Sequence, residues 1–123
     1  VDLAARKPVG GLIMESAFSS AVEVGRELFP FLPAGLLVRN RYDSIGKIGK
    51  VRAPVLLLHS RDDEFFGWHH AQRLYDAARA PQQLVELRGG HNDAFLVSDA
   101  AFAEALKGCL SDVTRDGVQA QAP

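Results

Sequence analysis

Residues 53–64 read APVLLLHSRDDE, a short apolar run that ends in a cluster of acids. An unbroken aliphatic run of this length, preceded by a proline, is typical of a strand buried on both faces of a parallel sheet. The next candidate strand, 83–87, leads into the segment LRGGHND at 87–93. An acid after one strand and a histidine after the next are the two parts of a general base with its orienting carboxylate.

The rest of the chain alternates strands and helices. An apolar run bounded by glycine at 9–15 predicts a first strand. Apolar residues at helical spacing predict helices at 17–28, 68–78 and 99–110. This alternation predicts an α/β fold with a parallel sheet and right-handed crossovers.

Less regular segments lie at both ends and in the middle. Residues 1–8 read as the last turns of a helix, because alanines precede two cations and a terminating proline. Residues 41–48 mix turn formers with apolar residues and predict a loop with a short helix. Residues 114–123 are polar and are expected to form a disordered tail, so that the folded part spans 1–113.

Composition narrows the possible functions. The 123 residues are 47% hydrophobic and 24% charged, which suits one globular domain. A net charge of −1 offers no basic surface for nucleic acid. The single cysteine, Cys109, excludes an internal disulfide and fits a reducing compartment, which favours the cytoplasm. Its position in a helical pattern indicates a buried thiol.

Asp63 and His91 are the predicted catalytic residues. The carboxyl ends of parallel strands meet at one edge of a sheet, so both side chains are expected there on neighbouring strands. Asp62 and Glu64 compete with Asp63 for the orienting role, but consecutive residues point in different directions and normally only one can meet the histidine. Asp63 is preferred, with Asp62 next.

Other polar residues fit catalysis or metal binding less well. His59 ends a buried strand and is expected to be a packed histidine. His69 and His70 are adjacent, and adjacent residues do not share a helix face, which argues against a paired metal site. No metal or cofactor is therefore predicted, and no phosphate-binding loop supports a flavodoxin-like domain. None of Ser16, Ser19 and Ser20 lies in the glycine-flanked turn that exposes a nucleophilic serine.

Several of these segments together resemble the alpha/beta-hydrolase fold family. The strand and turn at 11–18 (GLIMESAF) and the segment at 41–48 (RYDSIGKI) are similar to one branch of that family. The acid motif at 54–64 and the histidine motif at 89–93 (GGHND) are similar to the same branch. The branch holds small serine hydrolases related to palmitoyl-thioesterase-like and dipeptidyl-peptidase-like enzymes.

The resemblance implies that Asp63 is the acid and His91 the base of a Ser-Asp-His triad. It also implies that the chain holds the last three parallel strands of the sheet, with the N-terminal half of the fold and the nucleophile upstream of Val1. Two features depart from the branch: Gly67 stands where a proline is usual, and Phe65, Phe66 and Trp68 make the acid loop aromatic.

The predicted function is therefore that of a serine hydrolase acting on an ester, thioester, amide or peptide bond of a small-molecule acyl or peptide substrate. The chain alone, without an oxyanion hole and nucleophile, is expected to be inactive. The alternative is a catalytically inactive relic or interaction module of the same fold. In either case the first strand would expose an edge, through which the chain could self-associate.

Overall fold

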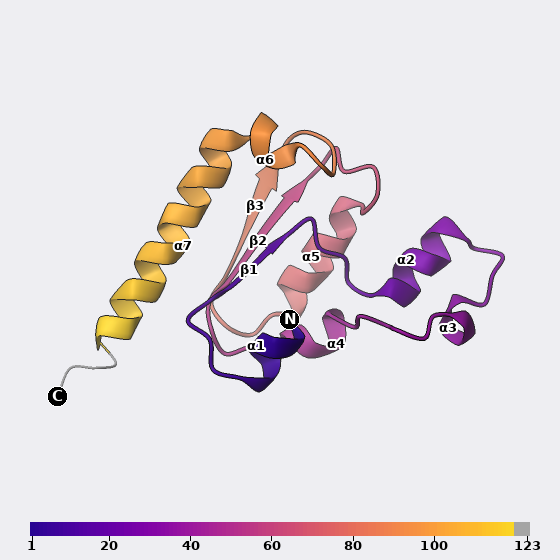
Figure 1. The fold of residues 1–123 in the computed structure, drawn as a ribbon, viewed down its shortest axis with the longest axis horizontal. Coiled ribbons are helices and arrows are strands. Elements are labelled where there is room, and N and C mark those ends of the chain that lie inside the picture. Colours follow the sequence, from indigo (N-terminus) through magenta and orange to yellow (C-terminus); the bar gives the residue numbers. More distant parts are fainter. Residues whose placement is uncertain (120–123) are drawn as a thin grey trace.

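The computed structural model describes residues 1–119, which form a three-stranded parallel sheet with helices on both faces. The strands are β1 (Leu12–Glu15), β2 (Val55–Ser60) and β3 (Gln82–Leu87), in the spatial order β1-β2-β3 (Figure 1). Both pairings are parallel, with Val55 of β2 opposite Leu12 of β1 and Gln82 of β3. The predicted α/β class and the three parallel strands are confirmed.

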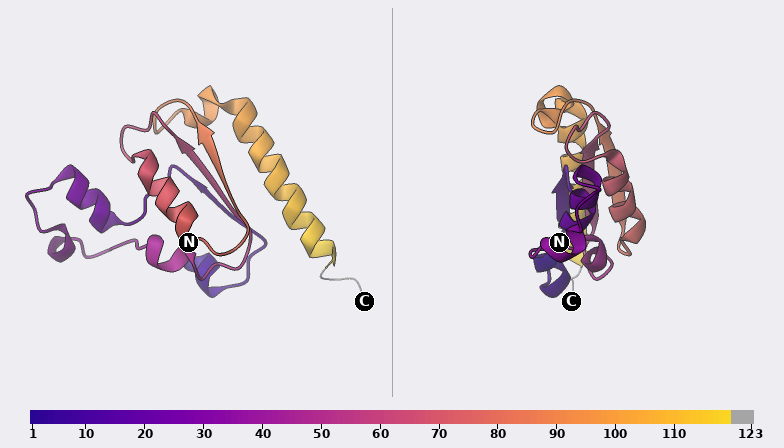
Figure 2. Two further views of the ribbon diagram at one scale, coloured as in Figure 1. Left: turned by 180° about the vertical axis from the view of Figure 1, so that it is seen from behind. Right: turned by 90° about the vertical axis from the view of Figure 1, so that its right-hand side faces the viewer.

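The helices are α1 (Asp2–Arg6), α2 (Ala21–Leu28), α3 (Ala34–Leu37), α4 (Ile45–Ile48), α5 (Trp68–Ala77), α6 (Ala94–Val97) and α7 (Asp99–Gln119). Helix α5 covers one face of the sheet and α7 covers the other, as the edge-on view in Figure 2 shows. Helices α2 and α3 extend sideways from the sheet (Figure 1). No helix in the described part of the chain combines the length and apolar character needed to cross a bilayer.

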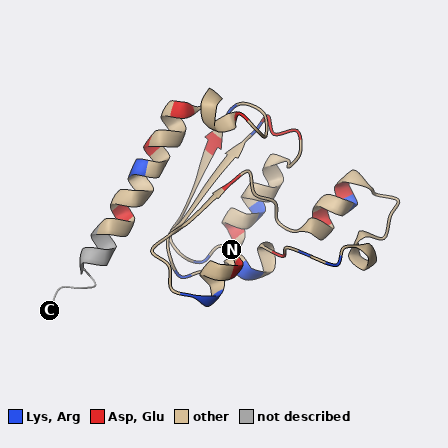
Figure 3. Ribbon diagram, in the orientation of Figure 1, with Lys and Arg blue, Asp and Glu red and all other residues tan. Residues whose placement is uncertain are grey.

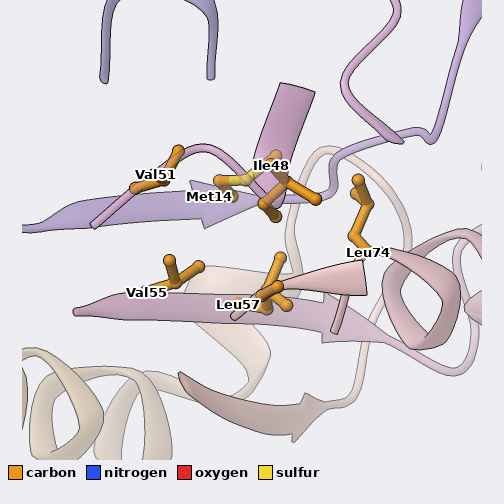
Figure 4. Close-up of a cluster of buried hydrophobic side chains, with 7 residues drawn as sticks. Met14, Ile48, Val51, Val55, Leu57 and Leu74 are labelled. Carbon is orange, nitrogen blue, oxygen red and sulfur yellow. The ribbon is translucent and has the colours of Figure 1, made fainter. Parts of the chain in front are cut away.

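The core is split into two clusters by β2. On one face, Val55 and Leu57 pack with Met14 of β1 against Ile48, Val51 and Leu74 (Figure 4). On the other face, Leu56 and Leu58 pack with Leu87 of β3 against α6 and α7. Every residue of β2 is buried, which explains why the sequence of this strand shows no polar alternation.

Helix α2 starts later than the pattern at 17–28 indicates. Ser20 is its N-cap, and the Ser20 side chain accepts a hydrogen bond from the peptide N–H of Glu23 at 3.2 Å. A serine in this position supplies an acceptor for an otherwise unpaired N–H of the first turn. The helix therefore begins at Ala21, and residues 17–20 connect it to β1.

The structure differs from the sequence-based expectation at the C-terminal end of α7. Residues 114–119 continue α7 instead of forming a tail, while residues 120–123 lie outside the described part of the chain. Strand β1 is open on one face, where Ile13 is 43% exposed. Helix α7 packs over β2 and β3, and its Val113 lies beside Gly10 and Gly11 at the start of β1.

Candidate active site

Two loops meet at the carboxyl edge of the sheet. The acid loop (residues 61–67) follows β2, and the histidine loop (residues 88–93) follows β3. Acidic residues gather in the acid loop (Figure 3). An Asp63 carboxylate oxygen, Oδ2, lies 2.8 Å from Nδ1 of His91. The predicted meeting of these two side chains is confirmed.

The carboxylate of Asp63 is fixed on its other side by the backbone of its own loop. Oδ1 accepts hydrogen bonds from the peptide N–H groups of Phe65 at 2.9 Å and Phe66 at 2.8 Å, and the side chain is 0% exposed. Burial raises the pKa of Asp63, but hydrogen bonds from Phe66, His91 and Phe65 outweigh it and bring the pKa below its ordinary value. Asp63 is therefore held as a carboxylate.

This arrangement fixes the tautomer of the neutral His91 ring. A carboxylate oxygen can only accept, so Nδ1 of His91 carries a hydrogen, and in the neutral imidazole Nε2 holds the lone pair. Within the part of the chain that the structure describes, Nε2 has no hydrogen-bond partner, and the side chain is 23% exposed. The rings of Phe65 and Phe66 stand edge-on to the imidazole, with centroids 5.3 and 5.0 Å away. His91 thus presents one basic nitrogen beside an apolar wall.

The two neighbours of Asp63 also hold the histidine loop. Glu64 accepts a hydrogen bond from the peptide N–H of His91 at 2.9 Å. Asp62 accepts a longer one from the peptide N–H of Gly89 at 3.4 Å. The sequence presented the three acids as competitors for one role, whereas the structure gives each its own donor. Together they hold the histidine loop at three points.

Gly89 allows the histidine loop to turn sharply after β3. Its φ is +102°, in the left-handed region, and a Cβ there would lie 3.0 Å from atoms of Asp93, Ala94 and Val97. Ser60 donates from its hydroxyl to the carbonyl of Gly89. Ser98, which the sequence did not single out, accepts from the peptide N–H of Arg88 at 2.7 Å. The loop is therefore anchored from β2 and from the start of α7.

The remaining candidates have other surroundings. His59 is buried and donates from Nε2 to the carbonyl of Phe66 at 2.7 Å, so it is a packed histidine as expected. Ser20 caps α2, and the Ser19 hydroxyl is fully buried 2.7 Å from Nδ1 of His70. Ser16 has a strained φ of +44°, and its buried hydroxyl has no partner in the described residues. The sequence did not indicate this backbone strain, because Ser16 has no flanking glycine.

His69 and His70 do come together, contrary to the expectation for adjacent helix residues. Their ring centroids are 4.3 Å apart in the first turn of α5, and both rings contact the carboxylate of Glu27 on α2. Burial lowers the pKa of His70, although the nearby Glu27 raises it. Side-chain contacts between α2 and α5 create this cluster, and no local pattern in the sequence indicates it.

Comparison with known proteins shows which fold family the chain resembles. No protein-family model matches the chain. An uncharacterized protein of Mycobacterium tuberculosis is 34% identical over 113 residues, which cover 91% of this chain and 40% of that protein. Alpha/beta hydrolase domain-containing protein 17B of Homo sapiens is 31% identical over 112 residues, covering 90% of this chain and 37% of that protein.

Solved structures agree in fold. The esterase domain of a Rhodothermus marinus protein superposes with a TM-score of 0.59 at 22% identity, over 84% of this chain and 54% of that one. A putative non-heme bromoperoxidase of Mycobacterium tuberculosis gives a TM-score of 0.66 at 14% identity, over 91% and 62%. The chain belongs to the alpha/beta-hydrolase fold family. It spans about 40% of the length of the relatives it matches.

Proposed function

We propose that the protein is a serine hydrolase that cleaves an ester, thioester, amide or peptide bond, with His91 as general base and Asp63 as its orienting acid. The observation that carries the proposal is the 2.8 Å contact between a buried, backbone-anchored carboxylate and Nδ1 of His91, which leaves Nε2 free. Membership of the alpha/beta-hydrolase fold family supports it, since the family order Ser, acid, His matches the order of these two residues.

The nucleophile in this proposal is a serine on a segment N-terminal to Val1. Its hydroxyl would donate to Nε2 of His91 and lose its proton to that nitrogen as it attacks the carbonyl carbon. The Asp63 carboxylate would stabilise the imidazolium that results. His91 would then return the proton to the leaving group, and water would release the acyl group by the same route. No cofactor is required for these steps.

The surroundings of His91 favour a substrate with an apolar acyl part. Phe65 and Phe66 stand edge-on to the imidazole, and Phe18 lies against Phe66 with ring centroids 5.0 Å apart. Aromatic side chains of this kind line apolar pockets and leave the few polar groups to fix orientation. We infer a small-molecule acyl or peptide substrate whose acyl side contacts this aromatic wall.

Turnover of p-nitrophenyl esters and labelling by a fluorophosphonate probe test the proposal in the intact protein. His91→Ala should lower kcat/KM by on the order of 10⁶-fold and Asp63→Asn by on the order of 10⁴-fold. Asp62→Asn is the matched control and should keep most of the activity, because Asp62 contacts the backbone of Gly89 and the side chain of Arg88 but not His91.

Three results would contradict it. The absence of labelling in the intact protein would favour the inactive or interaction-module alternative. Equal losses in Asp62→Asn and Asp63→Asn would remove the assigned role of Asp63. Labelling of Ser16, Ser19 or Ser20 that depends on His91 would place the nucleophile within this chain instead of upstream.

A further inference from the structure

Glu27, His69 and His70 form a cluster of three metal-ligand side chains away from the Asp63–His91 pair. Nε2 of His69 lies 2.8 Å from one carboxylate oxygen of Glu27, and Nε2 of His70 lies 3.2 Å from the other. One ligand atom from each residue falls within 4.8 Å of the other two. Glu27 and His69 are exposed, while His70 is fully buried, so the cluster opens to solvent on one side.

Both nitrogens of His70 contact polar groups, and the contacts of Ser19 favour the tautomer with the proton on Nδ1. The Ser19 hydroxyl contacts the carboxylate of Glu23, which can only accept, so the single hydroxyl hydrogen goes there. The Ser19 oxygen can then accept from Nδ1–H of His70 at 2.7 Å, and this shorter contact outweighs the 3.4 Å contact in which the Ser19 peptide N–H would donate to an unprotonated Nδ1. With the proton on Nδ1, neutral His70 presents the Nε2 lone pair to a carboxylate oxygen of Glu27, and this contact is repulsive unless a metal cation lies between them or the ring takes up a second proton.

The hydrogen bonds behind His70 have the arrangement that supports metal-bound histidines. Such a histidine usually donates its second N–H to a polar partner, which fixes the ring and raises its basicity. Here Nδ1–H leads to Ser19, then to the carboxylate of Glu23, which is paired with Arg73 at 2.6 Å. A buried imidazole, a hydroxyl, a carboxylate and a guanidinium thus form one continuous support.

Gly67 makes room for the second histidine. Its φ of −59° and ψ of 151° are open to any residue, so no backbone requirement explains a glycine at this position. A Cβ on Gly67 would however lie 2.8 Å from Nδ1 and 2.9 Å from Cε1 of His69. The missing side chain lets the His69 ring fold back beside His70, with its Nε2 against Glu27.

We propose that Glu27, His69 and His70 bind a Zn²⁺ ion that ties α2 to α5. Two imidazoles and one carboxylate suit zinc, whereas calcium and magnesium take oxygen ligands. Three protein ligands leave a coordination position for water. The ion would hold helix α2, which otherwise extends from the sheet, against the helix that follows the acid loop. This zinc site does not depend on the serine-hydrolase proposal.

Two other interpretations of the cluster predict different behaviour. Ser19, His70 and Glu27 follow the order of a Ser-His-acid triad, but Ser19 and His70 are both fully buried, so no acyl carbon can reach the hydroxyl. A protonated His70 paired with Glu27 would remove the repulsion without any metal. An experiment must therefore distinguish this His70–Glu27 ion pair from the zinc site.

Calorimetric titration of the intact, chelator-stripped protein with ZnCl₂ tests the proposal. We expect one Zn²⁺ to bind at this cluster. His69→Ala and Glu27→Gln should weaken that binding by more than the roughly 10- to 100-fold typical of losing an outer support. Both residues are exposed, so neither change disturbs the core. Gly67→Ala should also weaken binding, although it removes no ligand.

His91→Ala and Glu86→Gln are the matched controls and should leave zinc affinity unchanged. Zinc binding that is lost in His91→Ala but kept in His69→Ala would put the ion at the other site and overturn the proposal. So would the absence of binding in the unmodified protein.

Nitrogen NMR of the histidine rings gives a second readout in the unmodified protein. Without metal, we expect His70 to be neutral with its proton on Nδ1, and zinc should shift the Nε2 resonances of His69 and His70 alone. A doubly protonated His70 at neutral pH, unchanged by zinc, would establish the ion pair in place of the metal site.

Discussion

A carboxylate as deeply buried as that of Asp63 is stable only when hydrogen bonds replace the water that it has lost. Two peptide N–H groups and the ring of His91 make this replacement, and they lower its pKa despite burial. The pKa of Asp63 in the folded protein is therefore below the value of about 3.9 expected in the unfolded chain. A depressed pKa stabilises the fold at a pH above the unfolded value, and that stabilisation is lost as the pH falls through the folded value.

Asp63→Asn should remove this pH-dependent stabilisation. The difference in unfolding free energy between the unmodified protein and Asp63→Asn should be largest near neutral pH and shrink below about pH 4. Denaturant unfolding at a series of pH values measures it, with Asp62→Asn as control, because the Asp62 side chain is half exposed. A difference that stays constant down to strongly acidic pH would contradict a lowered pKa for Asp63.

The meeting of Asp63 and His91 could be predicted because strand order determines where these residues lie. Any acid after β2 and any histidine after β3 must lie near one edge of a parallel sheet. The separate donors of Asp62 and Glu64 could not be predicted, since they depend on how the two loops face each other. The same is true of Glu27 and His70, which lie on helices whose relative position is set by tertiary packing.

At the scale of elements, the two glycines Gly89 and Gly108 should respond in opposite directions to alanine. Gly89 has a φ of +102°, so Gly89→Ala should destabilise the protein by roughly 1–3 kcal/mol and move His91 away from Asp63. Gly108 lies inside α7, where a Cβ would meet no atom of another element within 4 Å, so Gly108→Ala should stabilise by roughly 0.5–1 kcal/mol. Thermal unfolding measures both, and equal shifts would refute the assigned backbone roles.

Element types were predictable where the apolar period was long, and element ends were not. The helices expected at 68–78 and 99–110 correspond to α5 and α7, because both show a clear apolar stripe. The continuation of α7 to Gln119 was missed since residues 114–119, apart from Val118, lack the bulky apolar side chains that mark a helix face. The degree to which Ile13 is exposed depends on where α7 crosses the sheet, which no local pattern indicates.

At the scale of the whole molecule, the sheet has an outer edge at β1. In the described residues β1 pairs only with β2, and Ile13 is exposed beside that free edge. Unpaired strand edges with apolar neighbours promote pairing between chains. We expect the 123-residue polypeptide to self-associate through β1 in sedimentation experiments at micromolar concentration.

Ile13→Lys should shift this polypeptide toward monomer, because a charge beside the strand opposes edge-to-edge pairing. Leu110→Lys, on the exposed side of α7, removes a similar apolar group away from the edge and should have little effect. A monomeric polypeptide, or equal effects of the two changes, would rule out association through β1.

The contacts that fix Asp63 differ in the sequence separation of the residues that they join. Its bonds to Phe65 and Phe66 span two and three residues, and the bond from His59 to Phe66 spans seven, whereas the contact with His91 spans 28. Short loops close quickly and lose little entropy. During biosynthesis, we therefore expect the acid loop to fix the carboxylate of Asp63 before His91 has left the ribosome. Pulse-labelled hydrogen exchange during refolding should accordingly protect the Phe66 amide before that of His91, and a reversed order would disprove this assembly sequence.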